Sequence, residues 1–123
     1  MTVGLSVANV ANAWLNELST LAPFAKLHTG DPGASGANNA SSVTTRMAIT
    51  WPGASGGSHS MTGSISWTAW AGSSETVSHL STWSASTAGN FAFSVAFSAS
   101  RAVAPGDTLT VTSLSVSQAP LAA

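Results

Sequence analysis

The hydrophobic pattern of the chain changes once, at Pro23, and this change constrains the fold more than any other feature. Before it, residues 5–21 carry apolar side chains at spacings of three and four, which predicts one amphipathic helix. Pro23 ends the helix, because the residue before a proline is pushed out of the helical region. The apolar stripe consists of Val7, Val10, Ala11, Trp14, Leu18 and Leu21.

After Pro23 the apolar residues alternate with small ones, which is typical of short strands separated by turns. The clearest alternation lies at 91–98, where Phe and Val alternate with Ala and Ser. The last two segments have opposite parity, so a bulge or kink near Thr112–Ser113 is expected between them. The Gly/Ser-rich stretches 33–42 and 53–60 are expected to be loops. The remaining predicted strands lie at 43–51, 65–67, 76–84, 109–111 and 114–116.

These patterns predict a mainly β fold, an antiparallel β-sandwich or small barrel of about six or seven strands with one N-terminal helix. A chain of 123 residues is expected to form one domain. Within it we expect the helix at 5–21, the β-sandwich at 24–117 and a flexible tail at 118–123. The predicted structural turns contain Asp31, Pro32, Gly33, Gly89, Asn90, Gly106 and Asp107.

The chain is poor in charge, with three Lys or Arg, four Asp or Glu and a net charge of −1. So few cations cannot make the many phosphate contacts of a nucleic-acid or anionic-membrane partner, so neither is expected. The chain has no Cys, which excludes disulfides and thiolate metal sites. No apolar run has the length of a membrane-spanning helix. No cofactor is expected.

One motif suggests a hydrolase. Residues 53–57 match the G-x-S-x-G pattern of a nucleophile elbow around Ser55. An elbow needs a strand before it and a helix after it, whereas a polar loop follows here, so we interpret the match as chance.

The histidines suggest a metal or acid–base site, since His28 and Asp31 are three residues apart. The acidic residues are scattered, however, and a zinc site needs three or four converging ligands. Structural roles are therefore expected for His28, His59 and His79, with His79 the best candidate for a buried, hydrogen-bonded histidine. We predict no catalytic and no metal residues.

The aromatic residues leave a third possibility open, a module that binds host glycan through exposed Trp51 or Trp70. Trp51, Trp67 and Trp83 lie at positions expected to face the core. Trp67 and Trp70 have opposite parity, so one of them is expected to face outward or into a neighbour.

In order and spacing, several motifs resemble small tail-fibre-like or minor virion structural proteins of tailed bacteriophages, particularly those of actinobacterial hosts. They are LHTGDPG at 27–33, TTRMAITW at 44–51, TVSHLSTW at 76–83, GNF at 89–91 and PGDTL at 105–109. The resemblance covers about residues 5–117 and implies a non-enzymatic virion structural role. The chain departs from the family's pattern at Thr44, Thr45, Ser81 and Ser84. The matching positions are Leu27, His28, Thr29, Asp31, Pro32, Gly33, Arg46, Thr50, Trp51, Thr76, Val77, His79, Gly89, Asn90, Phe91, Gly106, Asp107, Thr108 and Leu109.

The composition favours association, because few charges give little repulsion and the strand edges carry few guarding Lys or Pro residues. The leading prediction is an oligomeric capsid decoration or minor capsid protein that stabilises the shell. The alternative is a minor tail or tail-fibre protein. The expected partners are further copies of the chain, three at a capsid site, and the major capsid protein or tail proteins, in virions assembled in the host cytoplasm. The predicted assembly interface contains Val10, Trp14, Leu18, Leu21 and Trp70.

Overall fold

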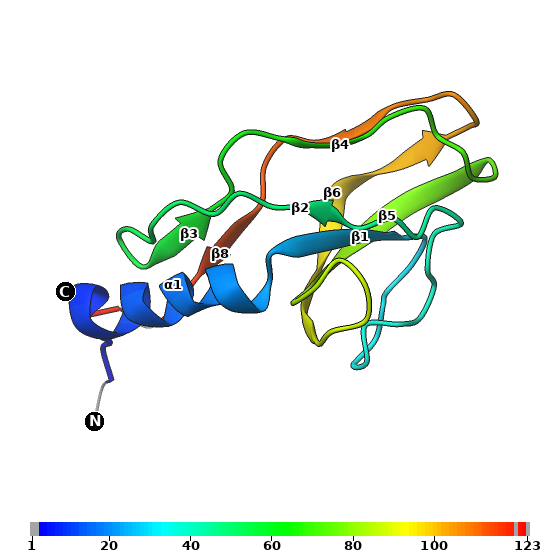
Figure 1. The fold of residues 1–123 in the computed structure, drawn as a ribbon. Coiled ribbons are helices and arrows are strands. Elements are labelled where there is room, and N and C mark those ends of the chain that lie inside the picture. The colour runs from blue at the N-terminus through cyan, green and yellow to red at the C-terminus, as the bar shows by residue number, and fades with distance from the viewer. Residues whose placement is uncertain (1–2, 120, 123) are drawn as a thin grey trace.

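The computed structural model describes residues 3–119 and 121–122, and its helical part lies where the sequence pattern places it (Figure 1). A π-helical turn, Val7–Ala11, continues into the α-helix α1, Asn12–Leu21. The hydroxyl of Ser6 accepts a hydrogen bond from the backbone N–H of Asn9 at 3.3 Å and caps the first turn. None of the helices in the described residues is long and apolar enough to cross a membrane.

Eight strands follow in the described part of the chain, and they form three antiparallel sheets. The largest sheet has the order β2-β1-β5-β6, and the smaller ones are the pairs β3-β8 and β4-β7. The predicted β-sandwich-like class is therefore confirmed. The strands are β1 Phe24–His28, β2 Met47–Ala48, β3 Ser58–Ser60, β4 Ile65–Trp67, β5 Glu75–Trp83, β6 Phe91–Val103, β7 Leu109–Val111 and β8 Ser115–Ser117.

The hydrophobic core lies between the four-stranded sheet and the β4-β7 pair, which passes over it in Figure 1. Each contributing strand sends alternate apolar side chains inward, as period two requires. One edge of the sandwich is fastened by Trp67, whose Nε1–H donates to the carbonyl of Thr45 at 2.9 Å. The buried cluster consists of Ala25, Leu27, Ile49, Ile65, Trp67, Trp70, Val77, Leu80, Val103, Leu109 and Leu114.

Strand β6 is the long edge strand of the main sheet and is irregular in its middle. Its ladder with β5 pairs Val77 with Arg101 and His79 with Ala96. Four residues of β6, 97–100, therefore lie opposite the single residue Ser78. Such a bulge bends a strand and interrupts its pairing.

The strand predictions need two corrections. The alternation at 43–51 forms a strand only at Met47–Ala48, where the chain pairs with Phe24 and Ala25 of β1. The segment 53–60, expected to be a loop, contains strand β3, which pairs with β8. The parity change near Thr112 is the point where the chain leaves β4 as its partner and joins β3.

The helix extends from the β-sandwich together with β3 and β8, and the described segments nearest the two termini lie side by side at the far end of the helix (Figure 1). Leu5 and Leu121 form a parallel bridge, and the N–H of Ala122 donates to the carbonyl of Leu5 at 2.8 Å. The N–H of Gln118 donates to the carbonyl of Gly57 at 2.9 Å. Positions 120 and 123 of the predicted tail lie outside the described residues.

Candidate assembly surface

One face of α1 is fixed to the rest of the chain. Ala11 and Leu15 are buried on this face. The side-chain carbonyl of Asn12 accepts from the N–H of Gly57 at 2.9 Å, and that of Asn16 accepts from the N–H of Ala54 at 2.7 Å. At the end of the helix, the indole N–H of Trp51 donates to the carbonyl of Ala22 at 2.8 Å. The helix therefore has a defined orientation on the loop 53–57.

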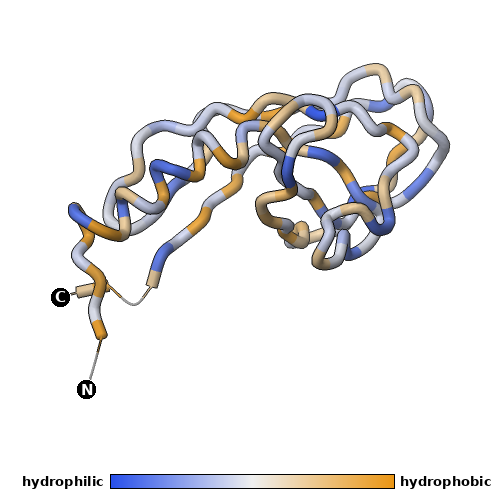
Figure 2. The backbone as a smooth tube through the Cα atoms, turned by 60° about the horizontal axis from the view of Figure 1, so that its bottom comes forward, coloured by the Kyte–Doolittle hydropathy of each residue, from blue (hydrophilic) through white to orange (hydrophobic). Residues whose placement is uncertain are grey.

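The adjacent face of α1 presents large apolar side chains to solvent. Trp14 is 57% exposed and Leu21 is 50% exposed, seven residues apart and so nearly in line along the helix. Val10 and Leu18 beside them are half-buried. Figure 2 shows hydrophobic and hydrophilic residues alternating along this helix. We call Val10, Trp14, Leu18 and Leu21 the helix stripe.

Trp70 does not share this surface. It is 2% exposed, and its indole N–H donates to the carbonyl of Ser73 at 3.0 Å. Trp67 is also buried, at 3% exposed, so the prediction that one of the two faces outward or into a neighbour is wrong. The parity argument fails because β4 ends at Trp67 and Ala69 adopts a positive φ of 48°, which turns the chain between them.

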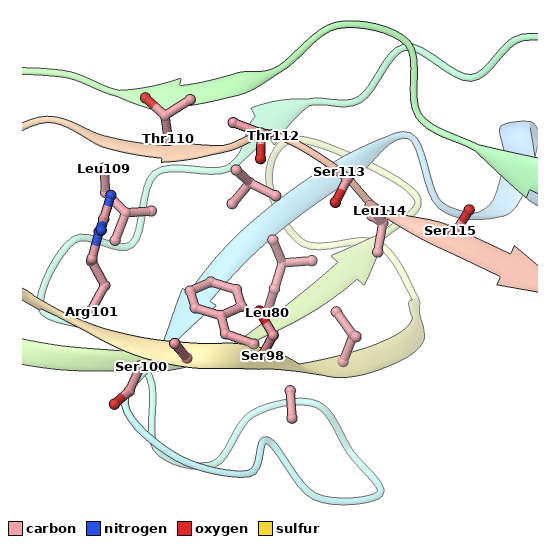
Figure 3. A pocket seen from close by; sticks show the side chains of 15 residues that line it. Leu80, Ser98, Ser100, Arg101, Leu109, Thr110, Thr112, Ser113, Leu114 and Ser115 are labelled. Atoms are coloured by element: carbon pink, nitrogen blue, oxygen red, sulfur yellow. The ribbon is translucent and has the colours of Figure 1, made fainter.

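A groove of about 430 Å³ lies between β6 and the β7–β8 segment (Figure 3). Leu80 lines it from β5, and Arg101 extends from β6 toward Leu109 on β7. Hydroxyl groups of Ser and Thr line much of the remainder. Because β6 has β5 on one side and this groove beside it, its edge is a second surface open to neighbours.

A serine and a histidine form a short hydrogen bond inside the molecule. Nε2 of His28 lies 2.7 Å from Oγ of Ser81, and Nδ1 lies 2.8 Å from the carbonyl of Asn38. The indole N–H of Trp83 donates to the same Oγ at 2.7 Å. Since a carbonyl only accepts, Nδ1 carries the proton, Nε2 accepts from Ser81, and Ser81 accepts from Trp83.

This chain of bonds resembles a nucleophile and its base, but both side chains are fully buried. A substrate cannot reach Ser81, so we assign the chain of bonds a structural role. Burial lowers the pKa of His28, which favours the neutral imidazole that this arrangement needs.

The prediction that His79 is the best candidate for a buried histidine is wrong. His28 and His59 are fully buried, whereas His79 is only partly buried. Nε2 of His59 lies 2.5 Å from the carbonyl of Pro52, and its ring packs on Trp51 with centroids 4.8 Å apart. His28 and His79 are partners across β1 and β5. Within residues 3–119 and 121–122, no group of three His, Cys, Asp or Glu could hold a metal ion.

The segment 53–57 forms a tight turn rather than an elbow. The backbones of Ser55 and Ser58 bond to each other at 2.9 and 3.0 Å. A strand, β3, follows this turn, not the helix that a nucleophile elbow requires.

Side chains and backbone both stabilise the predicted turns. The carboxylate of Asp31 accepts from the N–H of Gly33 at 2.9 Å, and that of Asp107 accepts from the N–H of Ala104 at 2.9 Å. The N–H of Asn90 donates to the hydroxyl of Ser84 at 2.8 Å. Positive φ angles occur at Gly33, Gly89 and Gly106, and Pro32 is buried.

A charge-poor β-sandwich with an apolar helix face in solvent is typical of a structural subunit that packs against neighbours. Residues 6–118 match the family described as Podophage GP4 fiber I protein gp80, and the chain belongs to this family. The family is one of phage fibre proteins, so the chain is a phage structural protein. No curated protein matches the chain.

Proposed function

We propose that this protein is a structural subunit of a phage tail fibre, without catalytic activity. The match over residues 6–118 to a podophage fibre family carries this proposal. It favours the tail alternative over capsid decoration, which stays a prediction. The host class suggested by the motif resemblance is actinobacterial.

The proposed partners are further copies of the chain and neighbouring tail proteins, and the proposed contact is the helix stripe. Trp14 and Leu21 supply exposed apolar area there, while the adjacent face already packs on the chain's own loop. Burial of the helix stripe against a partner is favourable, because removal of apolar area from water drives association.

Glycan binding through Trp70 has no support from the geometry, because that indole is buried. Trp51 is half-buried, packs on His59 and has its N–H bonded to Ala22. Trp70 therefore offers no face on which a sugar could stack, and His59 occupies part of the ring of Trp51.

The position of the protein in the virion tests the proposal. Antibodies raised against the purified chain should label the tail of purified particles in electron micrographs, and particles lacking the gene should stay unlabelled. Label distributed over the shell would instead support the decoration prediction. Absence of label from intact particles, with the protein present only in lysates, would contradict both.

A further inference from the structure

Two of the three cationic side chains of this protein lie at one small pocket. Lys26 projects from β1, and Arg46 immediately precedes β2, the neighbouring strand. The pocket has a volume of about 480 Å³. Its lining residues are Lys26, Thr44, Thr45, Arg46, Ser86, Thr87 and Ala88.

Arg46 is held in one orientation by three contacts. Its guanidinium lies over the ring of Trp83, 4.2 Å from the centroid. Its Nη1 donates to the carbonyl of Ala85 at 2.8 Å and to that of Ala88 at 2.5 Å. A guanidinium has five N–H donors, so these bonds occupy one nitrogen and leave the edge formed by Nε and Nη2. That edge is the one that binds a carboxylate or phosphate through two parallel hydrogen bonds.

The loop that receives Arg46 is itself closed and strained. Ser84 and Asn90 bond to each other through two hydrogen bonds, at 2.8 and 3.0 Å. Ala88 has a φ of 55°, which residues with a Cβ rarely adopt. The guanidinium edge is therefore preorganised before a ligand arrives, which reduces the entropy lost on binding.

The two positive charges face no acidic side chain among the described residues that line the pocket. Burial, and then the charge of Arg46, lower the pKa of Lys26. The structure shows no acidic side chain in the pocket lining, and the carboxylate of Glu75 is bonded to Ser41 and Ser42 instead. Two like charges placed close together repel each other. An anion that binds between Lys26 and Arg46 offsets this repulsion and is attracted by both charges.

Hydroxyl groups complete the lining. Thr44, Thr45, Ser86 and Thr87 are all exposed, and within the described residues none of these hydroxyls is engaged in a hydrogen bond. Each can donate to an anionic oxygen or to a ligand hydroxyl.

We propose that this pocket binds an oxyanion, a carboxylate or phosphate, carried on a hydroxyl-rich ligand about as large as one sugar residue. The Nε and Nη2 groups of Arg46 donate to two oxygens of the anion, and Lys26 adds a point charge. The pocket is larger than a bare oxyanion needs, and the four hydroxyls contact the remainder of the ligand. The proposal does not depend on whether the protein sits on a tail or on a shell.

The test compares anions at constant ionic strength and pH 7. Thermal unfolding and the Nε–H NMR signal of Arg46 are followed while sodium chloride is replaced by sodium phosphate, glucuronate, glucose 6-phosphate or neutral glucose. We expect a saturable shift of the Arg46 signal and of the melting temperature with the anions and none with glucose. Glucuronate and glucose 6-phosphate separate a sugar acid from a sugar phosphate as the preferred ligand, and both should bind more tightly than inorganic phosphate.

Matched variants separate binding from folding. Lys26→Gln removes one charge from the pocket without touching the bonds of Arg46, and Arg101→Gln removes the same charge from the groove beside β6. Lys26→Gln should weaken phosphate binding about tenfold, which is the loss of one charge-assisted contact. Arg101→Gln should bind as the unmodified protein does.

Two results would overturn the proposal. One is an equal shift of the Arg46 signal and of the melting temperature with phosphate and with chloride at the same ionic strength. That result would mean that salt screens the two cations without binding in the pocket. The other is an adventitious ion only, recognised when Lys26→Gln and Arg101→Gln lose phosphate binding equally.

Discussion

At the scale of single residues, the polar groups inside this protein are placed so that nearly every hydrogen-bonding atom has a partner. His28, Ser81 and Trp83 each use their donors and acceptors in one direction along a continuous chain. Nδ1 of His59 is the exception among the described residues that are not exposed, a buried acceptor without a partner. A buried polar group without a hydrogen-bond partner lowers the free energy of unfolding by about 1–3 kcal/mol, so the hydrogen bonds of His28 stabilise the fold.

The first prediction concerns the pH dependence of stability through His28. Burial lowers its pKa in the folded chain, so below the ordinary histidine pKa of about 6.5 the unfolded chain binds more protons. The stability that neutral His28 contributes to the folded chain is therefore fully present above a pH of about 6.5. It should fall as the pH drops below about 6.5, until the folded chain is protonated too.

Urea unfolding at several pH values between 7.5 and 5 measures this slope, since carboxylates titrate mainly below that range. His28→Gln should be less stable at pH 7.5 and should lose part of the slope. His79→Gln leaves the hydrogen bonds of His28 in place, so this variant should keep the part of the slope that is due to His28. Equal slopes in His28→Gln and the unmodified protein would contradict the assignment.

The second prediction concerns the strained residue Ala88, whose φ is 55°. The left-handed region costs a residue with a Cβ about 1–2 kcal/mol, and glycine enters it freely at some entropic cost. Ala88→Gly should therefore raise the free energy of unfolding by about 0.5–1 kcal/mol. Ala85→Gly, in the same loop without a positive φ, should lower it by a similar amount. The idea fails if both variants are destabilised in thermal unfolding.

At the scale of elements, the sequence predicts the parts whose environment is decided locally. The helix, its end at Pro23 and the alternation in β6 follow from local periodicity and were found. Periodicity does not predict which face of a helix stays in solvent, because that depends on the loop bonded to Asn12 and Asn16. Arg46 and Lys26 lie at one pocket because their strands are neighbours in the sheet, which local periodicity does not predict. The position of Arg46 just before a strand is the one sequence signal that could have suggested this pocket.

The third prediction concerns the long loop between β1 and β2, which packs on β6 through Gly36. This glycine is buried with a φ of +74°, and a Cβ there would clash with the ring of Phe91. Gly36→Ala adds left-handed strain and a clash, so it should lower the free energy of unfolding by about 2–4 kcal/mol.

Two other glycines separate the strain from the clash. Gly56 also has a positive φ, of +60°, but nothing lies within 4 Å of its Cβ position, so Gly56→Ala should cost about 1–2 kcal/mol. Gly53 has neither constraint, and Gly53→Ala should change stability by less than about 0.5 kcal/mol. Chemical denaturation of the three variants measures the order. Equal losses at Gly36 and Gly56 would show that Phe91 simply moves aside.

At the scale of the whole molecule, the scarcity of charge has two consequences that point the same way. Charged residues are 6% of the chain, so electrostatic repulsion between copies is weak. Four of the seven ionic side chains lie in turns, at Asp31 and Asp107, or at the pocket of Lys26 and Arg46. The four residues of the helix stripe are uncharged, and exposed Glu17 is the acidic residue beside Trp14 and Leu21 on this helix.

The last prediction is that the helix stripe holds copies of this chain together. Trp14 and Leu21 retain about half of their area for a partner. Full burial of such a side chain contributes about 1.5–3 kcal/mol, so the remaining half of both contributes about 2 kcal/mol. The double variant Trp14→Gln with Leu21→Gln should therefore weaken self-association about 30-fold in sedimentation equilibrium.

Thr20→Gln, an exposed change on the polar side of the same helix, should leave association unchanged. Both variants should melt within a few degrees of the unmodified protein, because Trp14 and Leu21 are at least half exposed and lie outside the buried core cluster. If the double variant associates as strongly as Thr20→Gln does, the contact between copies lies elsewhere, and the free edge of β6 is the next surface to change. Ser98→Lys would then place a guarding charge on that edge, with Ser64→Lys as the matched exposed control.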